Sequence, residues 1–89
     1  MQSRRYVVSG RVQGVWYRAA LQERAAEAGF CGYVRNLPDG SVEAVVSCED
    51  EACFERFETL LWEGSPASVV ENVTYERIDE LFEGAFERR

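Results

Sequence analysis

Aromatic and β-branched residues are concentrated at the start of the chain, and their side chains alternate between two faces. In residues 4–11, Tyr6 and Val8 fall on one face, while Val7 and Ser9 fall on the other. A segment with this two-residue period packs one face against a hydrophobic core. We therefore expect a β-strand over residues 4–11.

Two later segments have the spacing of hydrophobic residues that is typical of helices. In residues 17–28, Leu21, Ala25 and Ala28 recur at i, i+4 and i+7, and the glycine that follows suits a helix end. A second helix is predicted to start at the acidic residues 49–51, which complement the positive end of a helix dipole. It is predicted to stop at a Gly-Ser-Pro sequence, and its phenylalanine and leucine residues are expected to form core.

The remaining hydrophobic segments complete the pattern of an α+β fold. Further strands are predicted at 30–37, 41–47 and 69–78, with a short last strand near 85–88. A Pro-Asp-Gly turn joins the first two of these as a hairpin. The order β-α-β-β-α-β plus a short edge strand is typical of a ferredoxin-like α/β sandwich, in which two helices cover one face of a largely antiparallel sheet. Because 89 residues suit one core, we expect residues 1–89 to form a single domain.

The net charge of −6 is unevenly distributed along the chain. Residues 1–36 carry six arginines against two glutamates, whereas residues 37–89 carry fourteen acidic residues against four arginines. This acidic excess disfavours binding to nucleic acid or an anionic membrane. No apolar run is long enough to span a bilayer, and the start of the chain has no signal-peptide core. We therefore expect a cytoplasmic protein with neither nucleic acid nor membrane as a partner. A monomer is a separate expectation.

The residue types present exclude several kinds of catalytic site. The chain has no histidine and no lysine, which excludes imidazole catalysis and a P-loop nucleotide site. Cys31, Cys48 and Cys53 are odd in number and form no CxxC pair, so we expect buried thiols rather than a disulfide framework. They also lack the clustering of a zinc site. We expect neither a metal nor a cofactor.

The segment between the first strand and the first helix has the features of an anion-binding site. Gly10 and Gly14 allow its backbone to turn sharply and to approach another group closely. No Ser, Thr, Asp or Asn stands just before the helix to cap its first amides, so these are free for an outside acceptor. A helix N-terminus favours negative charge, and Arg18 adds a fork of donors that matches a phosphate or a carboxylate.

Two segments of the chain carry a family resemblance. The first is Val8-x-Gly10-x-Val12-Gln13-Gly14-Val15-x-Tyr17-Arg18, and the second is Gly32-Tyr33-Val34-Arg35-Asn36-x-x-x-Gly40-x-Val42. They resemble the two signature segments of the acylphosphatases in order and spacing, and the likeness extends over nearly the whole chain. The family pattern more often has Phe where Tyr17 stands and expects glycine where Cys48 stands.

The resemblance implies an acylphosphatase with the ferredoxin-like fold, acting on a small acyl phosphate to release a carboxylate and inorganic phosphate. It implies that Arg18 binds the phosphate, that Asn36 positions the attacking water, and that neither a metal nor a phosphoenzyme takes part. The phosphate-binding backbone would be that of Gln13, Gly14, Val15, Trp16 and Tyr17. The chemistry agrees, because phosphoryl transfer depends largely on positioning and charge stabilisation, and a carboxylate leaving group needs no general acid.

Several alternatives remain open at the level of the sequence. Trp16 either contacts the acyl part of the substrate or packs against the core, whereas packing is favoured for Tyr17. Arg11 and Arg35 either steer anions or keep strand ends soluble. The whole chain is alternatively a module that binds a phosphorylated metabolite without turnover, or an RNA-binding domain on the same fold. The net charge and the lack of a stacked aromatic motif count against RNA.

Overall fold

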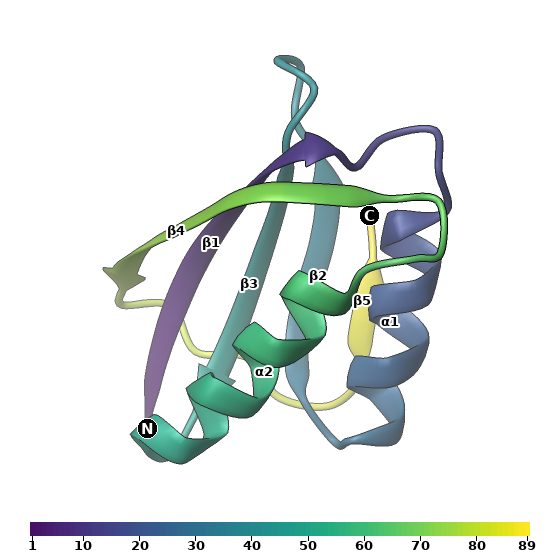
Figure 1. The fold of residues 1–89 in the computed structure, drawn as a ribbon. Helices are drawn as coiled ribbons and strands as arrows, with labels where there is room; N and C mark the ends of the chain where they lie inside the picture. The colour runs from purple at the N-terminus through teal and green to yellow at the C-terminus, as the bar shows by residue number, and fades with distance from the viewer.

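Two helices cover one face of a five-stranded sheet in the computed structural model, which describes residues 1–89 (Figure 1). The strand order is β4-β1-β3-β2-β5, with every neighbouring pair antiparallel except β2 and β5. The predicted ferredoxin-like α+β fold is therefore confirmed. The elements are β1 (Gln2–Arg11), α1 (Tyr17–Glu27), β2 (Cys31–Asn36), β3 (Val42–Cys48), α2 (Glu51–Glu63), β4 (Val69–Ile78) and β5 (Phe86–Arg88).

The C-terminal ends of strands β1 and β2 lie at the same end of the sheet, although the two strands are not direct neighbours. Both pair antiparallel with the central strand β3, so they run parallel to each other. Val8 of β1 and Asn36 of β2 lie on opposite sides of Val42. Two strand spacings separate their backbones by about 10 Å. The loop that follows β1 therefore leaves the sheet close to the end of β2.

The helix α1 packs on the sheet through one narrow face. Tyr17, Leu21 and Ala25 are buried on this face. The expectation that Ala28 belongs to it is wrong, because Ala28 is exposed. Its position is the C-cap, and Gly29 turns the chain away with a φ of 82°. Neither helix has the length and apolar content that crossing a membrane requires.

A glycine is required at the irregularity in the pairing of β1 with β4. The register between the two strands shifts between Ser9 and Gly10, and Gly10 has a φ of 123°. A Cβ atom at this position would overlap the carbonyl oxygen of Val69. Only glycine accommodates both the positive φ and the close approach of the neighbouring strand.

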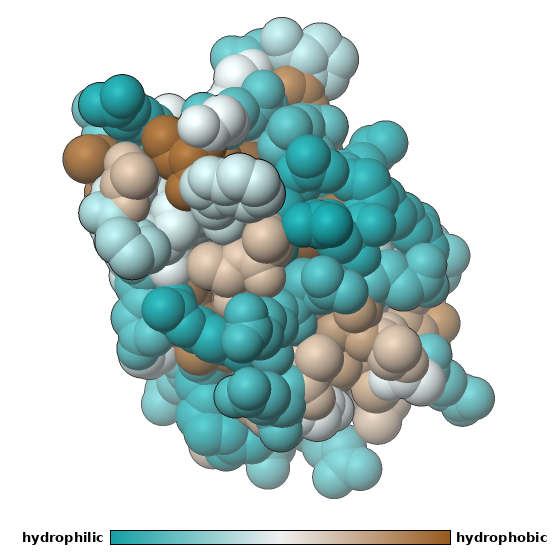
Figure 2. Space-filling model, turned by 90° about the vertical axis from the view of Figure 1, so that its right-hand side faces the viewer, coloured by the Kyte–Doolittle hydropathy of each residue, from teal (hydrophilic) through white to brown (hydrophobic).

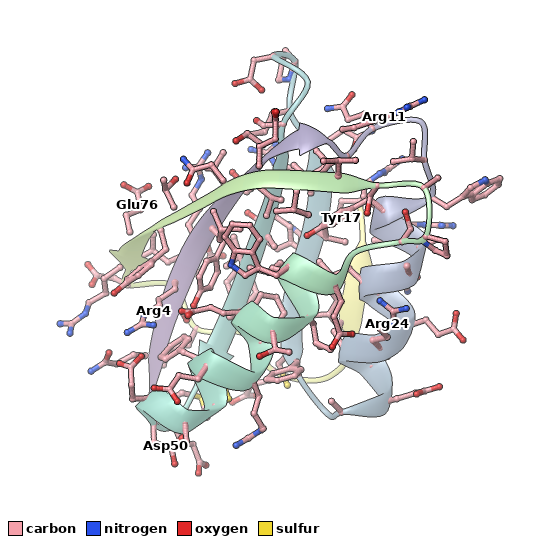
Figure 3. The ribbon with its side chains drawn as sticks, in the orientation of Figure 1. Arg4, Arg11, Tyr17, Arg24, Asp50 and Glu76 are labelled. Carbon is pink, nitrogen blue, oxygen red and sulfur yellow. A yellow bond between two sulfur atoms is a disulfide. The ribbon has the colours of Figure 1, made fainter.

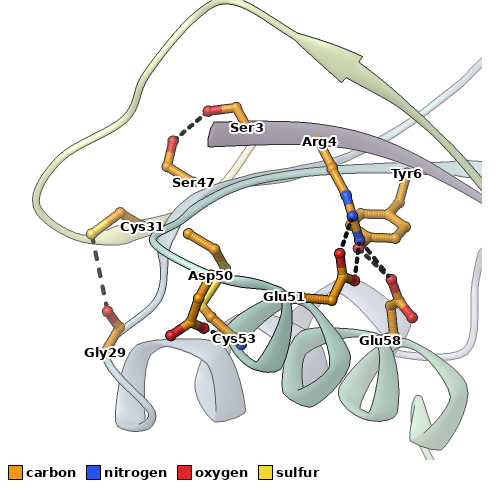
Figure 4. The surroundings of a disulfide bond; sticks show 11 residues. Ser3, Arg4, Tyr6, Gly29, Cys31, Ser47, Asp50, Glu51, Cys53 and Glu58 are labelled. Atoms are coloured by element: carbon orange, nitrogen blue, oxygen red, sulfur yellow. Dashed lines mark hydrogen bonds and ion pairs between the residues drawn. A yellow bond between two sulfur atoms is a disulfide. The ribbon is translucent and has the colours of Figure 1, made fainter. Parts of the chain in front are cut away.

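A disulfide joins Cys48 at the end of β3 to Cys53 in the first turn of α2 (Figure 4). The expectation of free thiols is wrong for this pair, and only Cys31 is free. Asp50 caps α2 by accepting a hydrogen bond from the Cys53 backbone N–H at 2.9 Å, which sets the first turn against the end of β3. The two Cα atoms are then 5.7 Å apart, within disulfide range. The sequence spacing alone does not reveal this turn.

Reduction of the Cys48–Cys53 disulfide is expected to destabilise the fold moderately. The two cysteines are separated by 5 positions, and closing so short a loop contributes about 2 kcal/mol to the free energy of unfolding. Urea unfolding with and without dithiothreitol measures the difference. Cys31→Ser is the matched control, because it removes a thiol that closes no loop and should leave this difference unchanged. A difference below about 0.5 kcal/mol would contradict the expectation.

Candidate active site

A cavity of about 280 Å³ lies where the 12–16 loop, which connects β1 to α1, meets the ends of β2 and β5. Its walls hold two arginines and no acidic residue, although the chain contains sixteen acidic residues. Of the seven predicted site residues, the cavity brings together all except Val15. The lining residues are Val12, Gln13, Gly14, Trp16, Tyr17, Arg18, Ala19, Asn36 and Arg88.

Strand alternation directs Asn36 toward the cavity. Val34 is completely buried on the helix-facing side of β2, and Asn36 follows two residues later on the same side. Arg35 lies between them and points to the other face, where its Nε donates to the carboxylate of Glu43 at 2.9 Å. This ion pair places Arg35 away from the cavity. Arg11 is exposed and also lies outside the cavity wall.

The backbone amides around the start of α1 are free to bind a ligand. No N–H group of residues 12–19 donates a hydrogen bond within the chain. Trp16 is the N-cap of α1 and makes no side-chain cap, as the sequence predicts. Gly14 and Trp16 have φ values of 73° and 65°. Left-handed residues at such short spacing are found in turns whose successive N–H groups bind anions.

The conformation of Trp16 is costly for a residue with a side chain. A left-handed non-glycine residue costs about 1–3 kcal/mol, and such residues are concentrated at functional sites. The indole does not offset this cost by packing, because it is 79% exposed. The open question about Trp16 is thus settled against core packing. Its side chain stands at the rim of the cavity.

The guanidinium of Arg18 is fixed by the C-terminal end of the chain. Arg18 projects from the first turn of α1, and its Nη1 donates to the backbone carbonyl of Arg89 at 2.6 Å. This bond orients the fork while leaving its other N–H groups for a ligand. A cation in the first helical turn is unfavourable, because it lies beside the positive end of the helix dipole. A bound anion would compensate both the charge of Arg18 and the positive end of the dipole.

The side chain of Gln13 connects the 12–16 loop to the hairpin that follows Asn36. Its Nε2 donates to the carbonyl of Leu37 and to that of Ser41, each at 2.8 Å. The hairpin is itself closed by hydrogen bonds from the Ser41 backbone and hydroxyl to Asp39, which hold the pKa of the Asp39 carboxyl below its usual value. The side-chain amide of Gln13 therefore connects the 12–16 loop to the hairpin next to Asn36.

Two further bonds attach the 12–16 loop and the start of α1 to the end of α2. The Tyr17 hydroxyl donates to the Leu61 carbonyl at 2.7 Å, and the Ser65 hydroxyl donates to the Val15 carbonyl. In Figure 3 the Tyr17 side chain reaches from α1 toward α2. Burial raises the pKa of the Tyr17 hydroxyl well above its usual value, so this group stays protonated. Packing, which the sequence favours for Tyr17, is confirmed by its 1% exposure.

Val15 is the one predicted site residue that the cavity wall does not include. Its side chain is only 7% exposed and packs in the core cluster. Its carbonyl is engaged by Ser65, so its N–H is the only backbone polar group left for a ligand. Val15 therefore holds the loop against the core.

The surface on the side of α1 is mainly hydrophilic. Figure 2 shows this side of the molecule, on which apolar residues appear in separate areas rather than in one continuous patch. A cavity that opens on such a surface suits a small polar ligand better than a hydrophobic one. Free amides, two guanidinium groups and a neutral amide are a suitable set of donors for a phosphoryl group.

Comparisons with known proteins agree with this arrangement. The sequence model of the family Acylphosphatase matches residues 4–87. The acylphosphatase of Xanthomonas oryzae pv. oryzae is 54% identical over 74 residues, which make up 83% of each chain. The acylphosphatase of Chromohalobacter salexigens is 48% identical over 80 residues, covering 90% of this chain and 88% of the relative. The crystal structure of acylphosphatase from Bacillus subtilis has a TM-score of 0.87 at 33% identity, covering 100% of this chain and 99% of that one.

Proposed function

The chain belongs to the acylphosphatase family and is thus a hydrolase of acyl phosphates. We propose the following roles for its residues in this reaction. The phosphoryl group binds to the backbone N–H groups of residues 13–17 and to the guanidinium of Arg18. The observation that supports this most strongly is the series of amides without any partner in the chain, most of them in residues that line a cavity without acidic residues. Such preorganised donors stabilise charge without reorganising during the reaction.

Asn36 positions the water that attacks phosphorus. Its side chain is a neutral amide, which can accept a hydrogen bond from the water and donate one to a phosphoryl oxygen. It cannot remove a proton, and the cavity wall contains no carboxylate or imidazole that could. The new P–O bond forms as the bond between phosphorus and the acyl oxygen breaks. One proton of the water then passes to a phosphoryl oxygen, and the other remains on the incoming oxygen.

The leaving group is a carboxylate, which explains why so few catalytic residues suffice. A carboxylate is stable without protonation near neutral pH, so no general acid is needed. The reaction therefore depends on orientation of the water and on stabilisation of the phosphoryl charge, for which the cavity has suitable groups. The products are a free carboxylate and inorganic phosphate.

The proposal predicts turnover of benzoyl phosphate with no added metal. We expect the loss of the acyl phosphate absorbance to follow saturation kinetics, with inorganic phosphate as a competitive inhibitor because it occupies the same donors. Treatment with EDTA should leave kcat/KM unchanged, since the proposed groups are all from the protein. Phosphate binding without turnover would instead support a binding module, and loss of activity in EDTA would contradict the metal-independent mechanism.

We also propose that residues 1–89 act as one domain, in a cytoplasmic monomer that binds neither nucleic acid nor membranes. The net charge of −6 supports the absence of polyanionic partners. The Cys48–Cys53 disulfide does not support the location, because disulfides are rare in the cytoplasm.

A further inference from the structure

Arg88 places a second guanidinium in the cavity wall, and the mechanism above does not use it. The strand β5 lies parallel to β2, with Arg88 beside Val34. Phe86 is buried on the helix-facing side of the sheet, and Arg88 follows two residues later on the same side. The side chain of Arg88 is therefore directed to the face on which Asn36 also lies.

Neither guanidinium in the cavity forms an ion pair with an acidic side chain. No ion pair of the chain involves Arg18 or Arg88, whereas the neighbouring Arg89 pairs with Glu87 at 3.8 Å. The two cations share one cavity with the positive end of the α1 dipole. Like charges at such a site repel each other, and a ligand of opposite charge removes the repulsion. The cavity wall thus carries two cationic side chains and no acidic one, in a protein whose net charge is −6.

We propose that Arg88 is a second binding residue for the phosphoryl group of the substrate. This inference rests on the proposed function of the same cavity. A phosphoryl group attached through one oxygen carries a charge of about −1.5 to −2 near pH 7, so Arg18 alone compensates little more than half of it. Arg18 also donates from Nη1 to the Arg89 carbonyl, which reduces its capacity for the ligand. Arg88 supplies both the missing charge and additional N–H donors.

The test is binding of inorganic phosphate, measured by amide chemical shifts or calorimetry at about 0.15 M salt. Arg88→Gln is expected to raise the Kd for phosphate about tenfold, the effect of losing one charge-assisted hydrogen bond. Arg88→Lys should recover part of the affinity, because it restores the charge but not the fork. Arg11→Gln is the matched control: it removes the same charge at the end of β1, outside the cavity, and should change Kd less than about twofold.

The outcomes separate this inference from the function on which it rests. If Arg88→Gln binds phosphate as tightly as the parent, while Arg18→Gln does not, then Arg88 has no part in binding and only this inference is wrong. If Arg11→Gln weakens binding as much as Arg88→Gln does, the effect is long-range and the proposed contact is again wrong. If the parent chain does not bind phosphate at all, both the cavity assignment and the role of Arg88 are contradicted.

Discussion

Replacement of Arg18 by glutamine is expected to abolish acyl phosphate turnover while the fold is retained. The guanidinium is the only group in the first turn of α1 that brings a full positive charge to the phosphoryl group, and arginines in this role contribute about 10³-fold or more to phosphoryl transfer. Glutamine keeps part of the length but has neither the charge nor the fork. We therefore expect kcat/KM for benzoyl phosphate to fall by at least about 10³-fold.

The stability of the Arg18→Gln variant should be close to that of the parent. The substitution removes one hydrogen bond to the Arg89 carbonyl, which contributes about 1 kcal/mol, and it also removes an unfavourable cation from the start of a helix. Arg56→Gln is a suitable control for the change in net charge, because Arg56 is exposed on α2 and lies outside the cavity. Thermal unfolding shows whether the fold survives. Turnover at the parental rate in folded Arg18→Gln would refute the assignment of this residue.

The local elements of the fold could be predicted from the sequence because residue patterns and turn residues are local signals. The alternation that starts at Tyr6 and Val8 predicts β1, and both side chains are fully buried in the core. The predicted range 69–78 coincides with β4. The order of the strands and the disulfide could not be derived in this way, because both depend on which distant segments meet. The prediction that Ala28 lies on the buried face is wrong for a different reason. The spacing of apolar residues in a helix does not show where its last turn moves away from the sheet.

The sequence could predict the 12–16 loop as an anion site, because two glycines and a missing N-cap residue are local signals. Asn36 depended on the family resemblance, since an asparagine before a turn is ordinary by itself. The sequence did not reveal three features of the candidate site. They are the hydrogen bonds from the Gln13 side chain to the hairpin, the Arg89 carbonyl that orients Arg18, and Arg88 in the cavity wall. The last two follow from the parallel pairing of β5 with β2, for which a three-residue strand gives no sequence signal.

Replacement of Asn36 by alanine is expected to remove hydrolysis while phosphate binding remains. The phosphoryl donors belong to the 12–16 loop and to arginines, so the ligand keeps its contacts when the amide is lost. The attacking water then has no fixed position, and loss of such orientation costs on the order of 10²-fold or more in kcat. Because Asn36 is exposed, the free energy of unfolding should change by less than about 0.5 kcal/mol. Steady-state kinetics and phosphate titration measure the two effects separately.

Asn72→Ala provides the matched control for this variant, since Asn72 is an exposed asparagine on β4 outside the cavity and should behave as the parent. A parental rate in Asn36→Ala would show that the water is positioned by another group. A rise in the Kd for phosphate that equals the loss of turnover would show that Asn36 binds the phosphoryl group rather than the water. If the 12–16 loop binds the phosphoryl group and Asn36 positions the water, kcat should fall while the phosphate affinity stays nearly constant.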